Sequence, residues 1–103
     1  PQDNTYIYGL FNIDKSIYLL SSDMDTKTSA VTLLDFNGNE KWHLNFLNIS
    51  GETFIDEDGS LWTQLGVTAQ EQPDNKFYLY HITRQGTLEG NRLDAGTKMF
   101  SGI

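Results

Sequence analysis

The chain of 103 residues contains no cysteine, which excludes disulfide bonds and metal sites built from thiolates. It has only two prolines, and no apolar run approaches the roughly 18 residues of a membrane-spanning helix. Positive charge is scarce, with seven Lys and Arg against 14 Asp and Glu and a net charge of −7. The basic residues form no cluster, so nucleic acids and anionic membrane surfaces are poor partners. Solubility accounts for the excess of carboxylates.

The residues that are abundant suit β-sheets. Aromatic residues make up 13% of the chain, and in residues 41–47 Trp, Leu and Phe alternate with Lys, His and Asn. This period of two is typical of a half-buried strand, and no segment shows a helical period of 3.6. The sequence therefore predicts an antiparallel all-β fold. The expected strands are residues 6–11, 16–21, 29–36, 41–47, 52–55, 60–66, 76–83 and a weaker 88–93, with residues 98–103 similar to 52–55.

The chain also repeats itself. Ser16-Ile-Tyr-Leu matches Ser60-Leu-Trp-Thr at an offset of 44 residues, and Gly38 matches Gly86 at an offset of 48 residues. A period of about 40–50 residues made of short strands is typical of β-propeller blades, which bury their faces only against neighbouring blades. We expect one unit over residues 1–103 with about two four-stranded antiparallel blades. The first repeat covers about residues 13–50 and the second about residues 55–96. A small β-sandwich is the alternative.

Residues 34–42 have the form Leu-Asp-x-x-Gly-x-x-x-Trp. Here the chain resembles the quinoprotein-like (PQQ-type) β-propeller repeat family, and the Asp-Glu-Asp-Gly turn at residues 56–59 before Trp62 supports the resemblance. In such repeats the glycine permits a positive φ in a turn, and the tryptophan packs between blades. The second copy departs from the pattern, with Gly90 at the tryptophan position and His81 near the position of Asp35. The predicted structural residues are Asp35, Gly38, Trp42, Asp56, Asp58, Gly59, Trp62 and Gly86.

The resemblance implies a fold and no cofactor, because most such repeats bind no quinone. The acidic turn at residues 56–59 supplies too few alternating oxygen ligands for a calcium loop, so we interpret it as a β-turn capped by its own aspartates and expect no metal. Propellers typically have about four to eight blades, so two blades cannot close a ring. We expect the remaining blades in a longer chain, of which this one is a part, or in an oligomer. The resemblance also implies a bacterial extracytoplasmic protein, at the periplasm, at the cell surface or secreted.

No catalytic signature is present, and no spacing supports a Ser/His/Asp arrangement around His43 or His81. Aromatic side chains could instead form a surface for a ligand or partner, although packing between blades is the alternative. The residues considered for this surface are Tyr18, Trp62, Tyr78, Tyr80 and His81. The polar loops at residues 22–28 and 67–75 are the other expected interaction sites.

Three functions follow. The first is a non-enzymatic binding or scaffold module that presents its loops to a protein or a small ligand. The second is a fragment of a propeller enzyme, of hydrolase, lyase or quinoprotein type, whose active site needs further blades. The third is a small carbohydrate-binding β-domain. Convergent ionisable groups in a pocket would indicate the enzyme, a broad exposed face the scaffold, and an exposed aromatic platform the carbohydrate binder.

Overall fold

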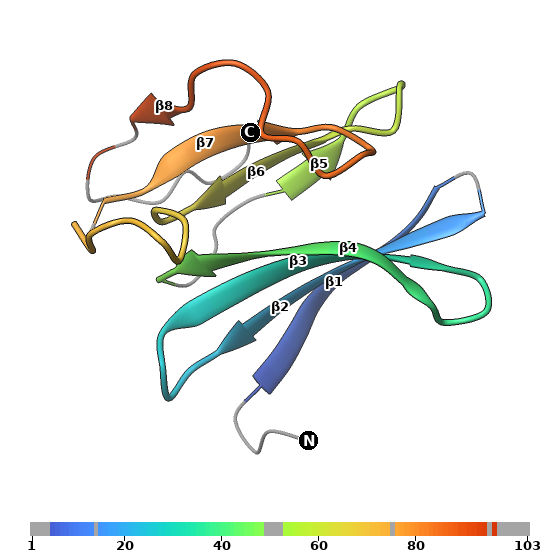
Figure 1. The fold of residues 1–103 in the computed structure, drawn as a ribbon, viewed down its shortest axis with the longest axis horizontal. Helices are drawn as coiled ribbons and strands as arrows, with labels where there is room; N and C mark the ends of the chain where they lie inside the picture. The colour runs from blue at the N-terminus through green and yellow to red at the C-terminus, as the bar shows by residue number, and fades with distance from the viewer. Residues whose placement is uncertain (1–4, 14, 49–52, 75, 95, 97–103) are drawn as a thin grey trace.

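The computed structural model describes residues 5–13, 15–48, 53–74, 76–94 and 96. They form two four-stranded antiparallel sheets, each with its strands in chain order, one stacked above the other in Figure 1. The described part of the chain contains no helix, so the predicted all-β class is confirmed. The first sheet consists of β1 (Thr5–Ile13), β2 (Ser16–Asp23), β3 (Thr28–Asp35) and β4 (Glu40–Leu47). The second consists of β5 (Thr53–Ile55), β6 (Leu61–Leu65), β7 (Tyr78–Ile82) and β8 (Leu93–Asp94).

The predicted strands agree with β1 to β7, but the predicted strand at residues 88–93 is wrong for most of its length. Only the last of its residues belongs to β8, and Leu88 makes a single isolated bridge to Ile82. Gly90, with φ of 70°, interrupts the extended backbone that a strand needs. The segment at residues 98–103 lies outside the described residues.

The internal repeat of the sequence corresponds to equivalent places in the two sheets. The repeated serine begins β2 in the first sheet and directly precedes β6 in the second, and the repeated glycine lies in the turn after β3 and after β7. The sheets span residues 5–47 and 53–94, whereas the sequence repeats run over about residues 13–50 and 55–96. The difference arises because β1 pairs with β2 and so belongs to the first sheet.

Three turns share one geometry, each closed by a glycine in the left-handed region. The φ values of Gly38, Gly59 and Gly86 are 86°, 86° and 85°. In the first turn the amide of Gly38 donates to the carbonyl of Asp35 over 3.0 Å, and the amide of Asp35 donates to the carbonyl of Asn39 over 2.9 Å. The other two turns repeat both bonds. This is a type I turn followed by a glycine bulge, a common hairpin connection that requires a positive φ at the glycine.

The core lies between the two sheets and takes side chains from both. Two hydrogen bonds join the sheets across it. The Tyr18 hydroxyl donates to the carbonyl of Gly59 over 2.6 Å, and the indole Nε1 of Trp42 donates to the carbonyl of Arg84 over 2.8 Å. The fully buried members of the core are Tyr18, Leu20, Val31, Phe46, Leu61, Leu65 and Ile82.

The loop between β6 and β7 covers the last part of the free edge of β4, at residues 45–47. The amide of Leu47 donates to the carbonyl of Val67 over 2.8 Å, and the amide of Ala69 donates to the carbonyl of Asn45 over 3.0 Å. An uncovered edge strand presents unpaired backbone groups that invite aggregation. The connection therefore protects β4 and also fixes the position of the second sheet relative to the first.

The two sheets pack through unlike faces. The repeat places Tyr18 and Trp62 at equivalent positions, each two residues after the repeated serine. Tyr18 is buried between the sheets, whereas Trp62 lies on the face of the second sheet that points away from the first, because its neighbours Leu61 and Thr63 are the residues buried inward. The inward face of one sheet is thus equivalent to the outward face of the other, and the sheets are related head to tail rather than by a two-fold axis.

The turn at Gly86 has no room for a side chain. A β-carbon there would lie 2.7 Å from Cδ2 of Trp42, whereas a β-carbon at Gly38 would meet nothing within 4 Å. Both substitutions to alanine strain a left-handed backbone, at a cost of about 1–2 kcal/mol. We expect Gly86→Ala to lower the free energy of unfolding by at least about 1 kcal/mol more than Gly38→Ala, because it also displaces the indole. Urea unfolding of the two variants measures the difference, and equal losses would contradict the packing described for Trp42.

Candidate functional site

Three of the five aromatic residues considered for a ligand surface are core residues, and their placement on a surface is wrong. Tyr18, Tyr78 and Tyr80 are only 0%, 9% and 3% exposed. Strand alternation turns each toward the opposite sheet, and each hydroxyl donates a hydrogen bond within the chain, to Gly59, Asp74 and Gly66 in turn. Burial raises the pKa of Tyr18 and of Tyr80. These side chains therefore hold the sheets together.

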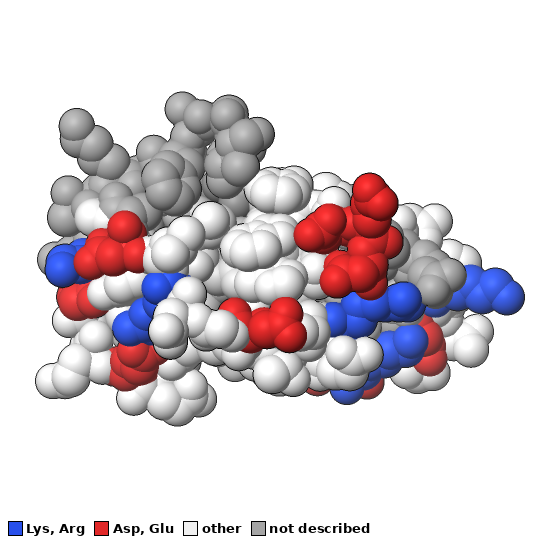
Figure 2. Space-filling model, turned by 90° about the horizontal axis from the view of Figure 1, so that it is seen from above, with Lys and Arg blue, Asp and Glu red and all other residues white. Residues whose placement is uncertain are grey.

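The other two, Trp62 and His81, lie together on the outward face of the second sheet. They are cross-strand neighbours, and their rings stack with centroids 4.2 Å apart and planes only 6° from parallel. Phe54, 41% exposed, lies opposite Trp62 on β5. Figure 2 looks onto this side of the molecule and shows an uncharged centre flanked by acidic side chains. Because His81 covers one face of the indole, the group is not the open aromatic platform on which a sugar ring would stack.

The structure also brings together a serine, a histidine and a carboxylate that the sequence spacing did not indicate. Nε2 of His81 lies 2.8 Å from Oγ of Ser60, and Nδ1 lies 3.2 Å from Oε1 of Glu89. The order of the three groups is that of a catalytic triad. Ser60, however, is only 2% exposed, and its hydroxyl donates to Oδ1 of Asp58 over 2.6 Å. A buried hydroxyl committed to a carboxylate cannot attack a substrate, so the arrangement orients His81 against the sheet.

The aspartates of the turns accept hydrogen bonds from the backbone amides of their own turns. Oδ1 of Asp35 accepts from the amides of Asn37 and Asn39, both over 2.9 Å, and the bond from Asn39 is the main cause of the lowered pKa of Asp35. In the acidic turn, Asp56 accepts from the amide of Glu57, and Asp58 accepts from both the amide and the hydroxyl of Ser60. The serine hydroxyl is the main cause of the lowered pKa of Asp58. The described residues contain no group of three side chains placed to ligate a metal ion.

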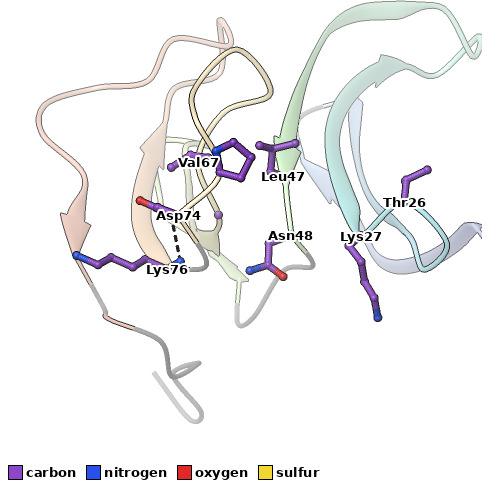
Figure 3. Close-up of a pocket in the computed structure, with 9 residues that line it drawn as sticks. Thr26, Lys27, Leu47, Asn48, Val67, Asp74 and Lys76 are labelled. Atoms are coloured by element: carbon purple, nitrogen blue, oxygen red, sulfur yellow. Dashed lines mark hydrogen bonds between the residues drawn. The ribbon is translucent and has the colours of Figure 1, made fainter.

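The two loops expected to interact with partners lie on either side of one cleft, at the end of the molecule where β2 and β6 finish. Figure 3 shows the β2–β3 loop on one side and the β6–β7 loop on the other, with the end of β4 between them. The volume of the cleft is about 290 Å³. Its lining residues are Thr26, Lys27, Leu47, Asn48, Gly66, Val67, Pro73, Asp74 and Lys76.

The lining of the cleft combines an apolar wall with a charged mouth. Leu47, Val67 and Pro73 supply the apolar part of the lining, while Figure 3 shows Lys27 and Lys76 extending outward on opposite sides. The Lys76 ammonium lies 3.4 Å from a carboxylate of Asp94, and both side chains of this pair are about half exposed, with relative accessibilities of 47% and 53%. Such an exposed pair is weak. The cleft thus offers apolar contacts together with two accessible ammonium groups.

The β6–β7 loop that forms one wall is held by ionic and aromatic contacts. Nη1 of Arg92 donates to Oε2 of Glu71 over 2.7 Å, and the guanidinium carbon lies 4.1 Å from the centre of the Tyr78 ring. The same oxygen of Glu71 accepts from the amide and the hydroxyl of Thr68, each over 2.9 Å. The Arg92 bond is the main cause that lowers the pKa of Glu71 to about 2. The hydroxyl of Tyr78 donates to Asp74, which raises the pKa of Tyr78 to about 12.

Comparison of the chain with protein-family models, with curated proteins and with solved structures found no match. The described residues include no helix of the length and apolarity needed to cross a membrane. The function of the chain is therefore inferred from its own residues.

The ion pair that supports the loop predicts a specific loss of stability in acid. The pKa of Glu71 is lowered from 4.5 to about 2 by folding, so its contribution is complete above about pH 4.5 and disappears as the pH falls through about 2. We expect Glu71→Gln to be less stable at pH 7 and to lose less further stability between pH 4.5 and 2 than the parent chain. Urea unfolding across this pH range measures both effects. Glu57→Gln, which changes an exposed carboxylate in the β5–β6 turn, should decline as the parent does, and equal declines in the two variants would contradict the role of Glu71.

Proposed function

We propose that the chain is a pair of β-propeller blades that acts as a non-enzymatic binding module, with the cleft between the β2–β3 and β6–β7 loops as its ligand site. The observation that carries the binding proposal is the convergence of these two loops, one from each sheet, on a single cleft of about 290 Å³ with an apolar wall. Ligand sites are commonly concave and mainly apolar, with a few polar groups that orient the ligand.

Three features support the assignment of the sheets as blades. Each sheet is a four-stranded meander, and the sheets meet through unlike faces. The outward faces carry exposed apolar residues, with Ile7 63%, Leu10 66% and Leu93 58% exposed, beside polar ones such as Thr32 and His43, whereas the outer faces of a closed sandwich are mainly polar. Trp42 packs against the second sheet at Gly86, which is the position between blades that the quinoprotein-like repeat gives to its tryptophan. That resemblance is also the basis for proposing a bacterial extracytoplasmic protein.

The chemistry of the cleft favours a ligand with a carboxylate and an apolar part. The apolar part would lie against Leu47, Val67 and Pro73, and the carboxylate would lie near Lys27 or Lys76 at the mouth. The binding function is favoured over an enzymatic one because the serine nearest to a histidine, Ser60, is buried and hydrogen-bonded to a carboxylate. It is favoured over carbohydrate binding because the indole of Trp62 is covered on one side.

The experiment uses N-acetyl-leucine as the probe, compared with N-acetyl-leucinamide, which has no carboxylate. Two-dimensional NMR of the isotope-labelled chain follows the amide resonances during titration. We expect shifts at the residues that line the cleft, with weaker binding of the amide. Lys27→Asn removes one ammonium from the mouth and should weaken binding of the acid by about fivefold, which corresponds to about 1 kcal/mol.

A matched control exists at the opposite end of β2. Lys15 and Lys27 both have a positive φ, 64° and 56°, and asparagine tolerates this conformation better than most residues. Lys15→Asn therefore changes charge and backbone preference equally, but lies away from the cleft and should leave binding unchanged. Equal effects of the two variants, or shifts confined to other parts of the chain, would overturn the assignment of the cleft.

A further inference from the structure

The two outward faces of the molecule are complementary in the same sense as the two faces already in contact. The outward face of the first sheet is equivalent by the repeat to the inward face of the second, and the outward face of the second is equivalent to the inward face of the first. The first-sheet outward face is formed by Ile7, Leu10, Ile17, Leu19, Ala30 and Leu34. The second-sheet outward face is formed by Phe54, Trp62, Leu79, His81 and Leu93, together with Gln64, which is buried within the chain, so the exposed part of this face lies around Phe54 and Trp62 and at Leu93.

We propose that these faces bind each other between copies of this chain, with the second-sheet outward face of one copy packed on the first-sheet outward face of the next. The proposal rests on the proposed assignment of the sheets as blades. Unlike faces that bind head to tail form a ring when the rotation closes. Since propellers typically have about four to eight blades and each chain contributes two sheets, two to four copies would complete a ring.

The contact inside one chain indicates how the contact between copies is made. Trp62 is equivalent to Tyr18, and Lys15 occupies the place in the β1–β2 turn that Gly59 occupies in the β5–β6 turn. Lys15 has a φ of 64° and Gly59 a φ of 86°, so both residues have the left-handed conformation, in a short turn where Ile13 pairs with Ser16 and in a longer one where Ile55 pairs with Leu61. The bond from the Tyr18 hydroxyl to the carbonyl of Gly59 would thus be repeated by the indole N–H of Trp62 and the carbonyl of Lys15 in the next copy.

The groups around Trp62 favour replacing its hydrogen bond within one chain by a bond to the next copy. In the single chain the indole of Trp62 donates to Asp56 over 3.3 Å, which is longer than a normal N–H···O bond. Giving up this bond for a shorter one to a carbonyl costs little. The same contact would bring the ammonium of Lys15 beside the acidic turn that contains Asp56, Glu57 and Asp58, so opposite charges would meet at this end of the interface.

Two variants block one face each without touching the core. Leu10, 66% exposed, lies on the first-sheet outward face, and Phe54, 41% exposed, lies on the second-sheet outward face. Leu10→Lys and Phe54→Lys should each convert the assembled chain to monomers, because every copy then lacks one half of the contact. Gln70→Lys, an exposed loop position, is the matched control and should assemble as the parent chain does.

Mixing the two blocked variants is the decisive step. The Phe54→Lys copy keeps an intact first-sheet face, and the Leu10→Lys copy keeps an intact second-sheet face. We therefore expect an equimolar mixture to form a one-to-one dimer, measured by light scattering after gel filtration and by native mass spectrometry. A parent chain that stays monomeric, a single variant that still assembles, or a mixture that stays monomeric would each overturn the proposal.

Folding and the cleft are checked on the same samples. Thermal unfolding establishes that each blocked variant is folded as a monomer. Titration with N-acetyl-leucine separates the two proposals, because the cleft lies in the loops rather than on the outward faces. A parent chain that stays monomeric but binds the probe would reject the docking of copies and leave the binding module in place. A parent chain that assembles but does not bind the probe would reject the cleft as the ligand site and leave the docking of copies in place.

Discussion

The packing of one tryptophan against one glycine turn is the contact on which the arrangement of the molecule depends. Trp42 on β4 lies against Gly86 in the turn after β7, and its indole N–H is bonded to the carbonyl of Arg84. The contact selects which faces of the sheets meet and sets the register between them. The apolar core, the covered edge of β4 and the convergence of the two loops at the far end follow from that register. A side chain at the turn would displace the indole from this contact.

The elements of the fold could be predicted from local patterns because their causes are local. Alternation specified β4, the β-branched and apolar content specified β3, and the glycines at positions 38, 59 and 86 specified three hairpin turns. The faces could not be predicted in the same way. Residues 77–81 are apolar or aromatic at almost every position, so nothing in their order tells that Tyr78 and Tyr80 point inward while His81 points outward. The packing of the other sheet decides this, and that information is not local.

The candidate site likewise has some features with local causes and others that depend on packing. The two loops were recognisable by their polar composition, but their meeting on one cleft depends on strand lengths in both sheets. The grouping of Ser60 with His81 and Glu89 was not recognisable, because Ser60 directly precedes β6, His81 lies on β7, and Glu89 lies in the loop after β7. A triad-like order of groups therefore appears without the exposure that catalysis needs. The proposed binding of a ligand and of a second copy rests on the cleft and the two outward faces.

The two sheets meet head to tail through unlike faces, and nuclear Overhauser effects in the isotope-labelled chain can establish this contact because they report which protons lie close together in solution. We expect cross-peaks between the indole protons of Trp42 and the α-protons of Gly86, with the α-protons shifted upfield by the ring. Cross-peaks between the rings of Tyr18 and Trp62, which occupy equivalent positions in the two sheets, would instead show that like faces meet and would rule out the head-to-tail arrangement.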